Sequence, residues 1–98
     1  MAIKIIIRRK FKEGHLRQAA EMLIQARRNA MQETGYISSE TLSNYDDPNE
    51  IIVLSMWQTM EDWSRYKESP PRKELEGMFA GMLKDPTHTI VYNMGMRT

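Results

Sequence analysis

The sequence predicts an α+β fold in which a four-stranded antiparallel sheet carries helices on one face. Three observations support this prediction. A β-branched run at residues 2–9 precedes a segment of helical period at residues 13–33. A second apolar run, residues 50–58, follows a dense turn at residues 44–49. Helical patterns then lead to an alternating stretch at residues 87–94. The resulting order, β-α-β-β-α-β, is ferredoxin-like, and we expect one domain spanning residues 1–98.

The first half of the chain changes from a strand pattern to a helix pattern. Isoleucines at alternate positions share one face of the first strand, where β-branched side chains suit a pleated surface. The strand closes on Arg8-Arg9-Lys10, which we expect to be a solvated strand end. Gly35 is a helix stop signal, since it can take the left-handed conformation. The helix itself is predicted from a stripe of mostly small residues: Leu16, Ala19, Ala20, Leu23, Arg27 and Ala30.

The next two strands are predicted to form a hairpin. Residues 36–44 alternate weakly, which predicts one face with Tyr36, Ser38, Glu40 and Leu42 and another with Ile37, Ser39, Thr41 and Ser43. The strand at residues 50–58 is apolar on both faces, with Ile51, Val53 and Trp57 opposite Ile52, Leu54 and Met56. A strand buried on both sides needs two layers of cover. Helices supply one layer, and a second subunit is the natural supplier of the other.

Capping signals place the remaining helices. Thr59 and Asp62 resemble a capping box, and Ser69-Pro70 is typical of a second helix start. The last helix is predicted from its strong apolar stripe: Leu75, Met78, Phe79, Met82 and Leu83. In the last strand, His88, Ile90, Tyr92 and Met94 alternate against Thr89, Val91 and Asn93.

Composition excludes several classes of function. Fourteen basic and thirteen acidic residues give a net charge of +1, so no polyanionic partner is indicated. The stacking aromatics of an RNA-recognition sheet are missing from both central strands, and we expect no nucleic-acid binding. No segment approaches the roughly 18 apolar residues of a membrane span, and we expect no membrane partner. The chain has no cysteine, which suits a cytoplasmic location. His15 and His88 form no metal-binding pattern, and no metal is expected.

The aromatic residues gather at one strand-to-helix corner. Trp57, Trp63 and Tyr66 lie within ten positions, with Tyr36, Phe79 and Tyr92 as candidate neighbours. Two interpretations stay open. Large aromatic side chains commonly form a core. They also line mostly apolar pockets in which a few polar tips orient a flat ligand, so the predicted ligand-binding residues are Trp57, Trp63, Tyr66, Phe79 and Tyr92.

Four segments of the chain resemble the antibiotic biosynthesis monooxygenase domain. They are Gly35-Tyr-Ile-Ser-Ser-Glu40, Asp47-Pro-Asn-Glu50, Ser55-Met-Trp-Gln-Thr-Met-Glu-Asp-Trp63 and the region from Glu68 to Arg72. The resemblance implies a dimeric α/β barrel, in which two sheets pack together with helices outside. It also implies oxygenation of quinols or polycyclic phenols by molecular oxygen with neither metal nor flavin, and it extends to relatives that degrade haem.

The resemblance carries over to only some residues. Trp57 matches the family's tryptophan on the third strand, Trp63 stands where some oxygenases have a functional tyrosine, and Val53 replaces their asparagine. The axial histidine of haem-degrading relatives has no counterpart in residues 65–70, so haem is not expected and no cofactor is predicted. Tyr66 and Asn93 are candidates to replace the lost polar groups, which makes Trp57, Tyr66 and Asn93 the candidate catalytic residues.

We therefore expect a homodimeric protein that binds a small planar aromatic molecule. Cofactor-independent oxidation of a quinol or polycyclic phenol is one function implied by the resemblance. A non-catalytic dimeric ligand-binding or regulatory module of the same fold is the alternative.

Overall fold

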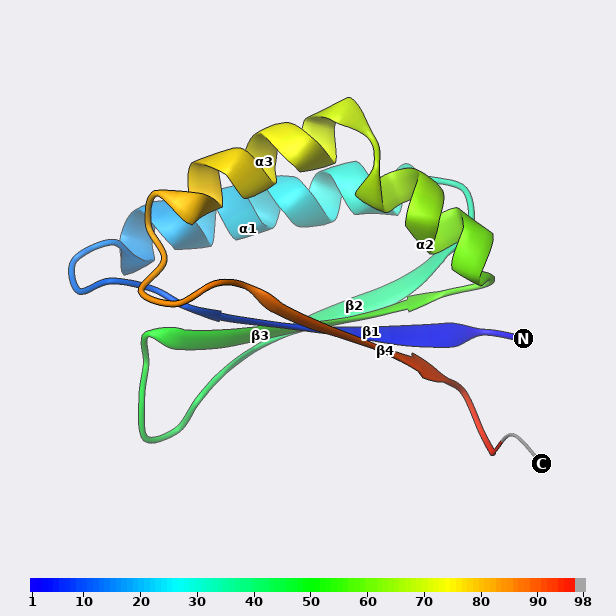
Figure 1. The fold of residues 1–98 in the computed structure, drawn as a ribbon, viewed down its shortest axis with the longest axis horizontal. Coiled ribbons are helices and arrows are strands. Elements are labelled where there is room, and N and C mark those ends of the chain that lie inside the picture. The colour runs from blue at the N-terminus through cyan, green and yellow to red at the C-terminus, as the bar shows by residue number, and fades with distance from the viewer. Residues whose placement is uncertain (97–98) are drawn as a thin grey trace.

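The structure, a computed structural model that describes residues 1–96, confirms the predicted fold class (Figure 1). The predicted domain ends at residue 98, so its last two residues lie outside the described part. The elements are β1 (Ile3–Lys10), α1 (Leu16–Met31), β2 (Tyr36–Ser43), β3 (Glu50–Trp57), α2 (Met60–Lys67), α3 (Pro70–Ala80) and β4 (His88–Asn93).

The four strands form one antiparallel sheet in the order β2-β3-β1-β4. Ile3 pairs with Trp57 on one side and with Asn93 on the other, which fixes the face of every residue in these three strands. Odd-numbered residues of β1, β3 and β4 point toward the helices, and even-numbered residues point away. All three helices lie on one side of the sheet (Figure 1).

The predicted face of Tyr36 is wrong, because β2 contains a bulge. The pairing with β3 shifts between Tyr36 and Ser38, so that Tyr36 opposes Trp57 and Ser39 opposes Ser55. A bulge inserts one residue and reverses the alternation beyond it. Tyr36 therefore shares the helix-facing side with Ser39, Thr41 and Ser43, whereas Ser38, Glu40 and Leu42 lie on the open face.

Two further expectations are corrected by burial. Arg9 is not a solvated strand end, because it follows Ile3, Ile5 and Ile7 in the inward register of β1 and is only 4% exposed. The buried face of α1 carries Ala19, Met22 and Ala30, with Ala20 and Arg27 exposed. The helix packs against both β2 and α3.

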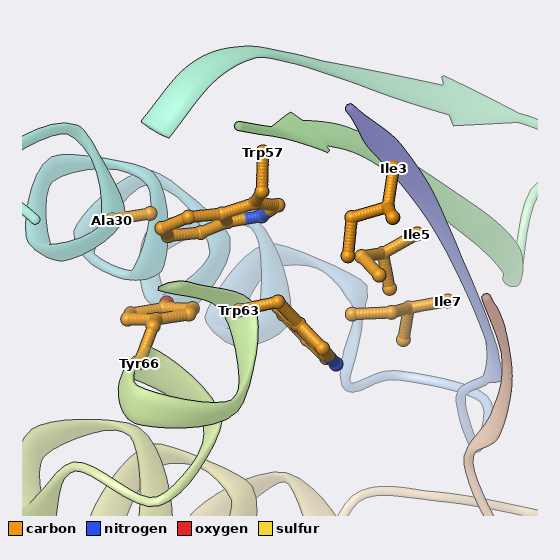
Figure 2. Close-up of a cluster of buried hydrophobic side chains, with 7 residues drawn as sticks. All are labelled: Ile3, Ile5, Ile7, Ala30, Trp57, Trp63 and Tyr66. Carbon is orange, nitrogen blue, oxygen red and sulfur yellow. The ribbon is translucent and has the colours of Figure 1, made fainter. Parts of the chain in front are cut away.

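The core on the helix face divides into two clusters. The tryptophan cluster contains Ile3, Ile5, Ile7, Ala30, Trp57, Trp63 and Tyr66 (Figure 2). The phenylalanine cluster contains Phe11, Ala19, Met22, Ile51, Leu75, Phe79 and Met82. Each cluster receives side chains from the sheet, from α1 and from one of the two later helices, α2 for the first and α3 for the second.

The other face of the sheet has no cover from the described residues. It carries apolar side chains from all four strands: Ile6, Leu42, Ile52, Leu54, Met56, Ile90 and Tyr92. Leu42 is 45% exposed and Tyr92 is 51% exposed, whereas the isoleucines, Leu54 and Met56 are half-buried. Sheets of ferredoxin-like topology bury one face under their own helices, so this second face is available to a partner.

Candidate functional site

The three aromatic residues singled out from the sequence are in mutual contact. The rings of Trp57 and Tyr66 stack, with centroids 5.0 Å apart and an angle of 23° between their planes. Trp63 lies 6.0 Å from each of them in a tilted arrangement. Figure 2 shows Trp57 reaching from the sheet toward Ala30 of α1 and Tyr66 lying beneath it. All three side chains are buried.

Helix α2 holds Trp63 and Tyr66 in place through its first turn. The Thr59 hydroxyl accepts a hydrogen bond from the Asp62 amide at 3.1 Å and donates one to the Asp62 carboxylate at 2.9 Å. The predicted cap at Thr59 is thus confirmed, and it satisfies a backbone N–H that the helix leaves unpaired.

Gly35 allows this helix start to approach β2 closely. Its φ is +88°, and a Cβ built there would lie 2.2 Å from the nearer carboxylate oxygen of Asp62. The Gly35 carbonyl also accepts a hydrogen bond from the Gln58 amide, at the end of the strand that carries Trp57. A residue with a side chain at this position would push α2 away from the sheet.

The polar tips of the aromatic residues are directed at nearby protein groups. The Trp57 Nε1 donates to the Ser55 hydroxyl at 3.1 Å, and the Tyr36 and Ser39 hydroxyls lie 2.7 Å apart. The Tyr66 hydroxyl donates to the Ala26 carbonyl of α1 at 3.3 Å, which is long for an O–H···O bond. A long hydrogen bond is weak, so this hydroxyl is the one most easily redirected toward a ligand.

A cavity of about 50 Å³ lies between the sheet, α1 and the tryptophan cluster. This volume exceeds the roughly 10–15 Å³ that one water needs and falls below the roughly 300 Å³ of small-molecule pockets. Trp57, Trp63 and Tyr66 line it, together with Val53.

A larger apolar groove, of about 380 Å³, adjoins this cavity between α1 and β2. Leu23, Arg27 and Thr41 line both spaces, so the groove and the cavity share a border formed by these side chains. Arg27 and Thr41 are exposed, so the groove opens to solvent at their side chains. The groove has the volume of a ligand pocket, and the small cavity lies beside it.

Two buried arginines form the polar wall of the cavity. Arg9 and Arg72 are 4% and 8% exposed, and the Nη2 atoms of both approach the same carboxylate oxygen of Glu76, that of Arg72 at 3.1 Å. Burial lowers the pKa of the Arg9 guanidinium, an effect that Glu76 opposes and Arg72 strengthens. An arginine side chain nevertheless stays positively charged at neutral pH.

The remaining predicted site residues lie elsewhere. Phe79 belongs to the phenylalanine cluster, where its ring contacts Phe11 at 5.9 Å. Tyr92 points to the open face of the sheet, opposite the side of Trp57. Asn93 shares the face of Trp57 but is separated from it by β1, a distance of roughly 10 Å across two strand spacings. One small ligand at the tryptophan cluster cannot contact Tyr92 of the same protomer.

Sequence reasoning missed the arginines that border the cavity. Arg9 could have been found, because it continues the alternation of Ile3, Ile5 and Ile7 into the buried face. Arg72 had two usable signals, its spacing of four residues from Glu76 on a helix and its place in a segment that resembles the family. The contact between Arg9 and Glu76 spans 67 positions, and no local pattern shows it.

Residues 1–96 contain no group of three or more histidine, cysteine, aspartate or glutamate side chains that could hold a metal ion. No helix among them is long and apolar enough to cross a bilayer.

The chain was compared with families and proteins already known. Residues 2–76 match the family model described as antibiotic biosynthesis monooxygenase. No curated protein sequence gives a significant match to this chain.

Several solved structures share the fold at low sequence identity. A conserved protein from Methanosarcina mazei is 16% identical, with a TM-score of 0.89 over 94% of this chain and 91% of its own. Rv0793 from Mycobacterium tuberculosis is 13% identical, with a TM-score of 0.90 over 99% and 98%. SnoaB from Streptomyces nogalater, a cofactor-independent oxygenase, is 9% identical, with a TM-score of 0.87 over 98% and 95%.

Proposed function

The chain belongs to the antibiotic biosynthesis monooxygenase family, and on this premise we propose that it binds a small planar aromatic molecule between α1 and β2. The observation that carries the proposal is that the α1–β2 groove borders the cavity lined by Trp57, Trp63 and Tyr66. A flat ring fits a groove of this size, and its inner edge would meet the stacked aromatic side chains.

The proposed activity is oxidation of the bound ligand by molecular oxygen without a cofactor. In such chemistry the electron-rich anion of a phenol is itself the reductant of oxygen. For an anthrone-like substrate, the ring CH₂ becomes a carbonyl, one oxygen atom enters the substrate and the other leaves as water. The fold of a cofactor-independent oxygenase, SnoaB, supports this proposal.

The protein would contribute binding, orientation and exclusion of water. Trp57 and Trp63 would form the walls against which the ring lies. Tyr66 would orient the ligand through its hydroxyl, once that group leaves its long hydrogen bond to Ala26.

A non-catalytic binding module of the same fold is the second candidate. Val53 lines the cavity in place of an asparagine, and Trp63 replaces a tyrosine, so two polar groups of the related oxygenases are missing. These replacements favour ligand binding without turnover.

The proposed functional unit is a homodimer in the cytoplasm, with residues 1–98 of each chain forming one domain. The uncovered sheet face supports the dimer, because Ile6, Leu54 and Ile90 lie side by side across three strands of it. Packing two such faces together removes apolar surface from water, which is worth about 25 cal/mol per Å².

Two measurements test the binding and the activity separately. Quenching of tryptophan fluorescence by menadione, with a Trp57→Phe variant that leaves Trp63 as the reporter, measures binding. Oxygen uptake with menadiol or anthrone measures turnover, with Tyr92→Phe on the opposite face as control. Quenching with oxygen uptake at the buffer rate would leave only the binding module. If menadione quenches neither protein, the aromatic site itself is wrong.

The dimer is tested by light scattering at micromolar concentration. We expect a dimeric mass for the wild type and a monomeric mass for Leu54→Lys, since this change places a charge at the centre of the open face. A monomeric wild type would contradict the dimer without affecting the proposed ligand site.

A further inference from the structure

An unusual concentration of buried charge lies between the two core clusters. The Arg72 guanidinium lies 5.4 Å from the ring centres of both Trp63 and Tyr66, and the Arg9 guanidinium lies 4.5 Å from that of Phe79. Glu76 joins the two arginines through one carboxylate oxygen. Two guanidinium groups and one carboxylate leave an excess of one positive charge. We refer to Arg9, Arg72 and Glu76 as the arginine cluster.

The arginine cluster also has unused hydrogen-bond donors. The Nε atoms of Arg9 and Arg72 are buried, and neither has a hydrogen-bond partner among the described residues. Leaving a buried charged donor without an acceptor destabilises a folded protein. The Arg9 and Arg72 side chains are 4% and 10% exposed, and both line the cavity beside the groove.

Structural needs alone do not account for this arrangement. A single arginine would pair with Glu76, and an apolar side chain of similar length would pack against Trp63 and Tyr66 without a desolvation penalty. The second guanidinium adds repulsion between like charges, which strengthens the lowering of the pKa of Arg9. The excess charge and the free donors are instead suited to an additional anion.

We propose that the arginine cluster is the subsite for an oxyanion carried on the planar ring of the ligand, either a carboxylate or a phenolate. The inference rests on the proposed function, because the ring occupies the same groove and cavity. Guanidinium groups bind oxyanions strongly through charge-assisted N–H donors, and the Nε–H groups of Arg9 and Arg72 are donors without a partner among the described residues. The ring edge would lie beside Trp63 and Tyr66, which already stack with Arg72.

The arginine cluster would also determine the protonation state of a phenolic ligand. A fixed positive charge in a buried site favours the anion over the neutral phenol, which lowers the pKa of the bound hydroxyl. The proton passes to solvent when the anion forms. The ligand would therefore bind in its electron-rich form, and recognition would discriminate against neutral rings of the same shape.

The first experiment compares an anion with a neutral compound of matching shape. Fluorescence titration with 1-naphthoate and 1-naphthamide is expected to give a roughly ten- to hundredfold lower Kd for naphthoate, the effect of one charge-assisted contact. Equal Kd values would overturn the oxyanion subsite and leave the aromatic site intact. If acetate competes as strongly as naphthoate binds, the oxyanion subsite stands and the aromatic site fails.

The second experiment uses variants with opposite expected effects. Arg72→Gln removes the excess charge and should weaken naphthoate binding roughly ten- to hundredfold. Glu76→Gln removes the competing internal carboxylate and should strengthen binding, with naphthoate raising the Tm more than in the wild type. Arg28→Gln, an exposed change on α1, should leave the Kd unchanged. If Arg72→Gln does not fold, Glu76→Gln decides the matter, because weaker binding in that variant would overturn the proposal.

A third titration distinguishes the two kinds of oxyanion. The phenolate of 4-nitrophenol absorbs visible light and its phenol form does not, so absorbance reports the protonation state of the bound compound. A lower pKa for bound than for free 4-nitrophenol assigns the subsite to phenolates. An unchanged pKa together with tight naphthoate binding assigns it to carboxylates, and failure of both anions to bind would overturn the proposal.

Discussion

The tryptophan cluster and the phenylalanine cluster cover the same face of one sheet, yet they differ in chemistry. The phenylalanine cluster consists of hydrocarbon and thioether side chains, with Phe11 and Phe79 in contact. The tryptophan cluster has indole and phenol groups whose polar atoms reach Ser55 and Ala26. A cavity adjoins the tryptophan cluster, and an open groove borders this cavity.

The two clusters differ in how completely their side chains are packed. Complete burial of Phe11 and Phe79 stabilises the fold and offers no polar group to a ligand. The tryptophan cluster is also buried, but its packing is incomplete and leaves space beside Trp57. The arginine cluster lies at the boundary, with Arg9 against Phe79 and Arg72 against Trp63. Four predictions test whether the two clusters differ in their effects on stability and on ligand binding.

The largest effect is expected from truncating one fully buried aromatic side chain in each cluster. Trp57→Ala and Phe11→Ala should each lower the free energy of unfolding by about 3–5 kcal/mol, because both leave a large cavity in the core. Urea denaturation measures this change. Only Trp57→Ala should also abolish fluorescence quenching by menadione. Equal loss of quenching in Phe11→Ala would show that the clusters act as one unit.

The next effect compares glycines near the two clusters. Gly35→Ala should cost about 1–3 kcal/mol, because it combines a positive φ with overlap of the new Cβ on Asp62. Gly77→Ala, in the exposed middle of α3, has no atom within 4 Å of its new Cβ and should stabilise the protein by about 0.5–1 kcal/mol. Thermal unfolding of both variants checks this. A loss of stability in Gly77→Ala would contradict the simple account of α3.

A smaller effect on stability is expected from replacing the residues at the cap positions of α2 and α3. Thr59→Ala should destabilise the protein by about 1 kcal/mol, since it removes the hydrogen bond to the Asp62 amide. Ser69 occupies the cap position of α3 but makes no side-chain capping bond, and its buried hydroxyl has no partner among the described residues. Ser69→Ala should therefore be close to neutral. Chemical denaturation of the matched pair tests the difference.

The smallest effect concerns the exposed ion pair at the junction of α2 and α3. A hydrogen bond from Lys73 and its charge lower the pKa of Glu68. A lowered carboxyl pKa contributes stability above the unfolded value, and that stability is lost as pH falls through the folded pKa. Lys73→Ala should return the pKa of Glu68 toward its ordinary value, as measured by NMR titration. The change should leave the Kd for menadione unaltered.

Much of the fold could be predicted because its signals are local. The alternation of Ile3, Ile5 and Ile7, the cap at Thr59 and the turn before β3 each need only a few neighbouring residues. The contact among Trp57, Trp63 and Tyr66 was also accessible, because a strand end followed directly by a capped helix keeps these residues close. The family resemblance was visible in the same segments and is confirmed by the match over residues 2–76.

The sequence by itself determined the order of elements, the alternation of side chains along each central strand and the aromatic corner, because periodicity and capping act over one or two turns. Only the tertiary structure decided that β2 bulges at Tyr36, that Arg9 is buried and that Glu76 joins it to Arg72. These features depend on strand register and helix packing between segments far apart in the chain. A local pattern of charged residues predicts a solvated strand end. Only the contact with the distant Glu76 shows that Arg9 is buried.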